Sequence, residues 1–120
     1  MVRSTVLVVE RDADIRELLR EALEEAGFGV IADAGDGANW PAHARPYLVL
    51  LDVSAWDAGE ILSLLYLRVG AAGVPVVALT TAPTHARPPL AADAWLAKPF
   101  RLADLYAAVE RWTGPRARSA

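Results

Sequence analysis

Polar residues that could transfer a phosphoryl group follow the apolar runs of this chain. These residues are Glu10, Asp12, Asp52, Thr80 and Lys98. A carboxylate such as Asp52 can attack a phosphoryl group and become an aspartyl-phosphate, provided that cations neutralise the charge that spreads over the phosphoryl oxygens. Lys98 offers those oxygens a compact positive charge, and Thr80 offers a hydroxyl donor. Carboxylates near Asp52 would hold Mg²⁺, which prefers oxygen ligands.

Lys98 stands out because it is the single lysine among twelve basic residues. An ammonium is a compact point charge and a guanidinium is a planar fork, so the two groups are not interchangeable. The lysine directly follows an apolar run. This placement favours the interpretation that a point charge is required there.

Five apolar runs without helical periodicity predict the strands that must position these residues. They span residues 5–9, 28–34, 47–51, 74–79 and 94–97. Helical spacing of apolar residues predicts helices at 15–26, 61–68 and 102–112. Asp14 and Glu17 form a capping box that begins the first helix, and Gly27 can end it. Prolines shorten any helix around Pro41 and disfavour a full helix at 82–92.

Strands that are apolar throughout and alternate with helices indicate an α/β fold with a doubly wound parallel sheet and helices on both faces. In such sheets, ligands bind outside the carboxyl ends of the strands, where the winding order reverses. The polar residues described above follow the strand ends. We therefore expect them to meet at one edge of the sheet, although they lie far apart in the sequence.

The composition indicates one compact domain. The chain has 120 residues, of which 54% are hydrophobic and 22% charged, and its net charge is -3. A chain of this size can bury a core, and its apolar content is too high for a disordered protein. Cysteine is absent, which excludes disulfides and cysteine-based zinc sites. We expect a single domain at residues 1–113 and a short, basic, disordered tail at 114–120.

The pattern of hydropathy and charge also restricts the partners. No apolar run reaches the roughly 18 residues that a membrane span requires, and no signal peptide is recognisable. We therefore expect a cytoplasmic protein without a membrane partner. The acidic balance argues against nucleic acid as a partner, because phosphate backbones are normally bound by a basic patch.

Four sequence motifs resemble those of the receiver domains of bacterial two-component response regulators. Residues 6–19, VLVVERDADIRELL, resemble the opening strand, acidic cluster and first helix of that family. The segment LVLLD, which ends at Asp52, resembles its phospho-acceptor strand. The segments PVVALT, which ends at Thr80, and WLAKPF, at 95–100, resemble its switch and lysine motifs. The resemblance implies a flavodoxin-like, five-stranded parallel sheet of order 2-1-3-4-5, with shortened second and fourth helices, and a cis Lys98–Pro99 bond.

The resemblance also implies a function and a role for each site residue. A histidine kinase or phosphotransfer protein would transfer phosphate to Asp52, and Thr80 and Lys98 would contact the phosphoryl group. Trp95 would occupy the aromatic switch position beside Thr80. The domain would signal to an unknown downstream protein by contact, and it would be no enzyme beyond its own phosphorylation and dephosphorylation. Dimerisation is compatible with this role.

The metal site implied by the resemblance differs at Arg11. Magnesium would be held by Glu10, Asp12, Asp52 and the backbone of Ser54, but Arg11 stands where the family has a second acid that ligates the metal. At an effective dielectric constant of about 20 and a separation of ~5 Å, this exchange costs on the order of 10 kcal/mol gross. We therefore expect Arg11 to weaken the Mg²⁺ site.

Two other functions are compatible with parts of the sequence. If the Arg11 guanidinium pairs with Asp52, the chain would be a pseudo-receiver, a phosphate-independent interaction module locked in one conformation. If the guanidinium turns into water, the acceptor remains accessible. A flavin-binding protein of the same architecture is disfavoured, because the loop after the first strand is charged rather than rich in glycine and hydroxyl residues.

Overall fold

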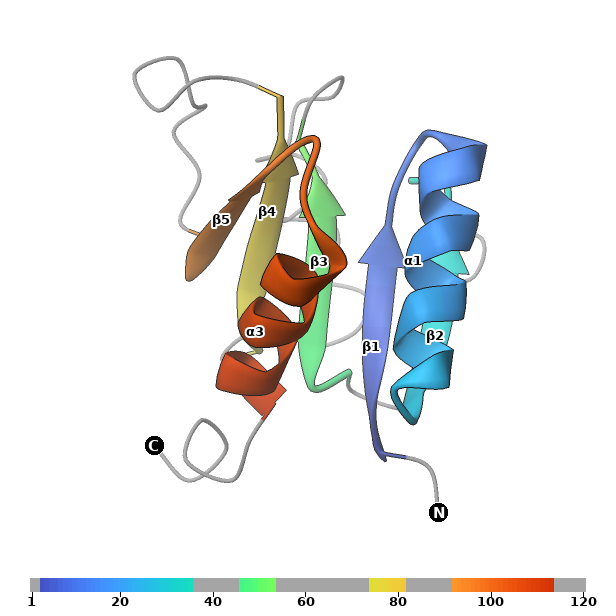
Figure 1. Cartoon of the computed structure of the whole chain (residues 1–120), viewed down its shortest axis with the longest axis vertical. Coiled ribbons are helices and arrows are strands. Elements are labelled where there is room, and N and C mark those ends of the chain that lie inside the picture. The colour runs from blue at the N-terminus through green and yellow to red at the C-terminus, as the bar shows by residue number, and fades with distance from the viewer. Residues whose placement is uncertain (1–2, 36–45, 54–73, 82–91, 114–120) are drawn as a thin grey trace.

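Five strands and two helices are seen in a computed structural model of the chain, which describes residues 3–35, 46–53, 74–81 and 92–113 (Figure 1). The strands are β1 (Arg3–Val9), β2 (Phe28–Asp33), β3 (Leu48–Asp52), β4 (Val76–Thr80) and β5 (Ala94–Ala97). The helices are α1 (Ala13–Glu25) and α3 (Leu102–Thr113). The predicted helix at 61–68, the shortened helices around Pro41 and at 82–92 (Ala92 excepted), and the tail at 114–120 lie outside the described residues.

The strands form one parallel sheet in the order β2-β1-β3-β4-β5, as predicted. Successive side chains of a strand point to opposite faces. Val6 and Val8 of β1 accordingly belong to a core cluster on one face, and Leu7 and Val9 belong to a cluster on the other. Every residue of β3 and β4 is buried. Burial on both faces explains why these strands are continuous apolar runs in the sequence.

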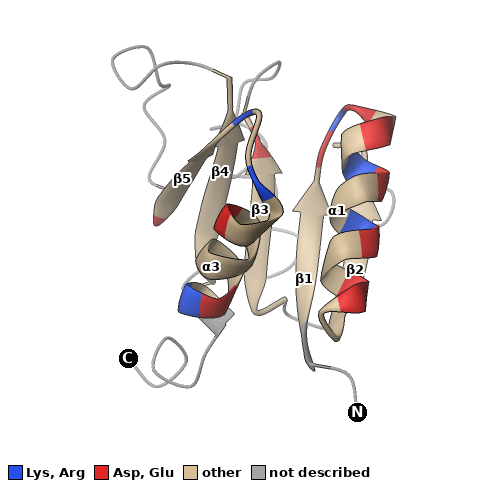
Figure 2. Ribbon diagram, in the orientation of Figure 1, with Lys and Arg blue, Asp and Glu red and all other residues tan. Residues whose placement is uncertain are grey.

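The helices α1 and α3 cover the same face of the sheet (Figure 1). Leu19 and Leu23 of α1 and Leu105 and Val109 of α3 are fully buried in one cluster with residues of the sheet. The Tyr106 hydroxyl of α3 also donates a hydrogen bond, 3.3 Å long, to a carbonyl of α1. Charged residues lie on the exposed sides of the helices and at the strand ends (Figure 2).

The start of α1 differs from the predicted capping box. The N-cap is Asp12, whose Oδ1 accepts hydrogen bonds from the backbone N–H of Asp14 at 2.9 Å and of Ile15 at 3.1 Å. Asp14 therefore lies in the first turn, where its negative charge is favourable next to the helix dipole. The predicted end is confirmed, because Gly27 has a φ of 96°, a value that glycine adopts without steric cost.

Asp93, directly before the edge strand β5, is hydrogen-bonded to Val76 of β4 through both its side chain and its backbone. The Asp93 carboxylate accepts a hydrogen bond from the Val76 N–H at 2.7 Å, and the Asp93 N–H donates to the Val76 carbonyl at 2.8 Å. This pairing aligns Thr80 with Ala97 at the other end of the two strands. The implied cis Lys98–Pro99 bond is present.

No helix in the described part of the chain is long and apolar enough to cross a membrane.

Candidate functional site

The carboxyl ends of the strands bring Glu10, Asp52, Thr80 and Lys98 to one edge of the sheet, as predicted. Hydrogen bonds continue the strand pairing there: the Glu10 N–H donates to the Asp33 carbonyl at 3.0 Å, and the Lys98 N–H donates to the Thr80 carbonyl at 2.7 Å. A pocket of about 400 Å³ opens at this edge. Its described lining consists of Glu10, Arg11, Asp12, Ile15, Asp52, Thr81 and Lys98.

The Lys98 ammonium joins the two acids at the floor of the pocket. Its Nζ lies 2.9 Å and 3.0 Å from the two carboxylate oxygens of Glu10, and 3.2 Å from Oδ1 of Asp52. The exposed fraction of the side chain is 0% for Glu10, 4% for Asp52 and 10% for Lys98. Charges removed from water in this way need close partners, and each of these three has one. We call these three residues the buried triad.

The pKa of the Glu10 carboxyl is raised within the buried triad. Burial of the carboxylate is the main cause, the hydrogen bond from Lys98 opposes it, and the negative charge of Asp52 adds to the rise. Loss of hydration therefore outweighs the contact with the ammonium. The Glu10 carboxyl therefore holds its proton more tightly than an exposed glutamate does.

Asp12 lines the pocket, but its carboxylate caps helix α1. One of its carboxylate oxygens accepts both hydrogen bonds of the N-cap. An arginine that was not singled out in the sequence, Arg16, holds the same loop from the first turns of α1. Its Nη1 donates to the carbonyl of Glu10 at 2.9 Å and to that of Arg11 at 3.4 Å. The backbone between β1 and α1 is thus fixed from both sides.

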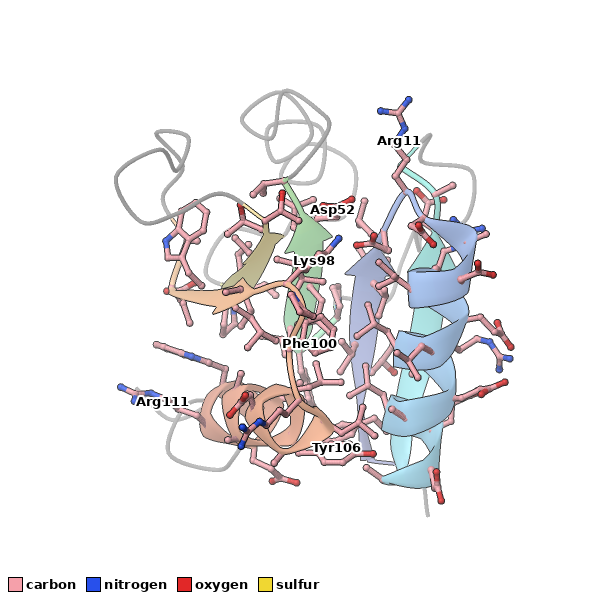
Figure 3. All side chains as sticks on the ribbon, turned by 45° about the horizontal axis from the view of Figure 1, so that its top comes forward. Arg11, Asp52, Lys98, Phe100, Tyr106 and Arg111 are labelled. Atoms are coloured by element: carbon pink, nitrogen blue, oxygen red, sulfur yellow. The ribbon has the colours of Figure 1, made fainter. Side chains whose placement is uncertain are left out.

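Arg11 is exposed, and its guanidinium points away from Asp52 and Lys98 (Figure 3). Of the two orientations considered from the sequence, the structure shows the one in which the arginine turns outward. The ammonium of Lys98, not the Arg11 guanidinium, lies against the Asp52 carboxylate. The lock required for a pseudo-receiver is therefore not favoured.

The two predicted switch residues lie next to the site but not in its pocket. Thr80 is 1% exposed at the end of β4, and Thr81 lines the pocket in its place. Trp95 is half-buried in β5 and packs against the core cluster on the sheet face opposite α1 and α3. Ser54, predicted to contribute a backbone ligand, lies outside the described residues. The switch roles of Thr80 and Trp95 stay predictions.

The described side chains do not fit a divalent cation as they are arranged here. Within residues 3–35, 46–53, 74–81 and 92–113, no three acidic or histidine side chains are grouped so that they could hold a metal ion. The Lys98 ammonium already lies within 3.2 Å of oxygens of both Glu10 and Asp52. Positive charge between these two carboxylates is thus supplied by the chain itself.

The chain is similar in sequence to known regulatory proteins. No family model matches the chain. The probable transcriptional regulatory protein SilR of Salmonella typhimurium is 37% identical over 110 residues, covering 87% of this chain and 48% of that protein. A response regulator receiver protein of Anaeromyxobacter is 33% identical over 104 residues, covering 86% of this chain and 43% of that protein. The chain spans about half the length of these curated relatives.

Solved structures of receiver domains share the fold. The response regulator TrrA of Thermotoga maritima, solved with Mg²⁺ and beryllofluoride, has a TM-score of 0.73 and 27% identity, covering 91% of this chain and 98% of that one. The receiver domain of the sensor histidine kinase PA1611 of Pseudomonas aeruginosa, with a magnesium ion in its active-site cleft, has a TM-score of 0.77 and 22% identity, covering 94% and 99%. The second of these likenesses concerns the fold alone.

Proposed function

Because the chain is a receiver domain of the response-regulator family, we propose that it accepts a phosphoryl group on Asp52. The donor would be a histidine kinase or a phosphotransfer protein, and the phosphorylated domain would signal by protein contact in the cytoplasm. The observation that carries this proposal is the Lys98 ammonium, which lies 3.2 Å from Oδ1 of an almost buried Asp52 at the floor of an open pocket.

The proposed reaction needs a nucleophile and a charge partner. An oxygen of Asp52 attacks phosphorus as the P–N bond of a donor phosphohistidine breaks, and the bonding electron pair stays on the imidazole, which takes a proton from water. The Lys98 ammonium, already beside the acceptor oxygen, neutralises part of the charge on the phosphoryl oxygens. Thr80 and Trp95 would respond to that charge as the switch pair.

For magnesium we propose a weaker site than in the solved neighbours that hold it. Arg11 replaces one acid, Asp12 commits an oxygen to the helix cap, and Lys98 already bridges Glu10 and Asp52. Glu10 and Asp52 are the side chains that would face a cation in this pocket. No step of the proposed transfer depends on the ion.

Phosphorylation at Asp52 is tested with a small phosphoryl donor. The purified chain is incubated with phosphoramidate, with and without Mg²⁺, and its intact mass is measured over time. We expect the mass of one phosphoryl group to appear on the wild type and not on Asp52→Asn. A wild type that gains no mass under either condition would show that this receiver is not a phospho-acceptor.

A further inference from the structure

The charges around the pocket do not balance once Asp52 carries a phosphoryl group. Its described lining holds three acids, Glu10, Asp12 and Asp52, and two cations, Arg11 and Lys98. Lys98 is already shared between Glu10 and Asp52. Phosphorylation would turn the acceptor carboxylate into a group with a charge of roughly -2. A single ammonium cannot neutralise this group and Glu10 together, so a second positive charge is needed.

Arg11 is placed to supply that charge. Apart from Lys98, it is the only basic residue of the described pocket lining. Its side chain is exposed, and exposed side chains change rotamer within nanoseconds. Its backbone is fixed, because Arg16 holds the carbonyls of Glu10 and Arg11 and the cap at Asp12 holds the start of α1. The guanidinium can therefore change direction without movement of the loop.

We propose that Arg11 is an anion-responsive arm that turns from its outward direction toward Asp52 when the pocket holds a phosphoryl dianion. Its planar fork can donate two parallel hydrogen bonds to phosphoryl oxygens, a geometry that suits phosphate better than an isolated ammonium does. Arg11 thus supplies positive charge that a metal ion would otherwise bring. The described carboxylates are not arranged to hold such an ion. This inference rests on the proposed phosphorylation of Asp52.

A consequence is that phosphorylation proceeds without a divalent cation and depends on the charge at position 11. The rate of mass gain with phosphoramidate is measured in excess EDTA for the wild type, Arg11→Gln and Arg11→Lys. Arg101→Gln is the matched control, because Arg101 is exposed and does not line the pocket. We expect Arg11→Gln to slow the reaction at least about tenfold, Arg11→Lys to restore part of the rate, and Arg101→Gln to react as the wild type does.

Movement of the arm is observed directly by nitrogen-15 NMR of the arginine side chains. The Nε–H signal of Arg11 is assigned by its loss in Arg11→Gln, and it is followed in EDTA before and after phosphorylation. We expect this signal to shift and its exchange with water to slow, whereas the signal of Arg101 stays in place. Asp52→Asn treated in the same way should show no change.

The outcomes distinguish a failure of this inference from a failure of the proposed function. Phosphorylation of the wild type at the same rate as Arg11→Gln in EDTA, or an Arg11 signal that stays unchanged in the phosphorylated protein, overturns the arm and leaves Asp52 as the acceptor. Phosphorylation of the wild type only when Mg²⁺ is present also overturns the arm alone. Absence of any phosphorylation overturns both.

Discussion

Two clusters of this domain contain one cation between two carboxylates, and they behave in opposite ways. In the buried triad, Lys98 lies between Glu10 and Asp52. On the exposed side of α1, Arg20 is hydrogen-bonded to Glu17 and to Glu24. We call this second group the surface triad.

Burial decides whether the pKa of a carboxyl beside its cation is raised or lowered. The pKa of Glu17 is lowered, chiefly by its hydrogen bond with Arg20, whereas burial raises the pKa of Glu10 in spite of the hydrogen bond from Lys98. Water stabilises the charged carboxylates on the helix surface, whereas loss of hydration disfavours the charged form of Glu10 at the strand ends. The same set of charges can therefore stabilise a helix slightly in one place and leave a site short of positive charge in the other.

The largest expected difference between the triads is in their sensitivity to loss of the cation. Lys98→Met keeps most of the apolar stem but removes the cation between two buried carboxylates, which should lower the free energy of unfolding by about 3–5 kcal/mol. Arg20→Met removes the cation from exposed acids that water can solvate, so a much smaller change is expected. Urea unfolding of both variants at neutral pH measures the difference. Equal losses would show that burial does not distinguish the triads.

The pH dependence of stability should have opposite signs in the two triads. Glu10 has a raised pKa in the folded state, so its contribution to stability is fully present below its ordinary value of 4.5 and is lost as the pH rises through the raised pKa. Glu17 has a lowered pKa, so its contribution is present above 4.5 and is lost as the pH falls through the lowered value.

These signs are measured by subtracting the free energies of unfolding of two glutamine variants from that of the wild type between about pH 3 and 7. The difference for Glu10→Gln should fall as the pH rises, and the difference for Glu17→Gln should fall as the pH falls. If both differences change in the same direction, the burial argument for Glu10 is wrong.

The smallest expected effect is that of salt. At about 1 M NaCl the screening length is only ~3 Å, which weakens interactions between exposed charges and leaves buried pairs largely intact. The stability difference between the wild type and Arg20→Met should therefore shrink between about 0.05 M and 1 M NaCl, and that for Lys98→Met should change little. A strong salt dependence of the Lys98 variant would mean that the buried triad is open to solvent.

The sequence predicted the buried triad better than it predicted the loop between β1 and α1, which carries Arg11 and Asp12. Apolar runs identify strands buried on both faces, and parallel strands must bring their carboxyl ends to one edge, so the meeting of Glu10, Asp52 and Lys98 follows from the topology. The unusual single lysine marked the cation that joins the two acids.

The structure of this loop could not be predicted, because it depends on which aspartate caps the helix and on contacts between side chains and backbone. Asp14 was expected to begin α1, but aspartate is a good N-cap at either position, and in the structure Asp12 caps the helix. The contact of Arg16 with the carbonyls of Glu10 and Arg11 exists only once the helix packs beside the strand. The direction of the Arg11 side chain depends on its rotamer, which the residue type leaves open.

The measurement that tests the central claim most directly is the chemical location of the phosphoryl group. After treatment with phosphoramidate, the protein is reduced with borohydride, which converts an aspartyl-phosphate to homoserine, and the peptide that contains Asp52 is sequenced by mass spectrometry. We predict homoserine at position 52 in the wild type and aspartate there in an untreated sample. Aspartate at position 52 after treatment, or homoserine at another aspartate, would contradict the assignment of the buried triad as the phosphoryl site.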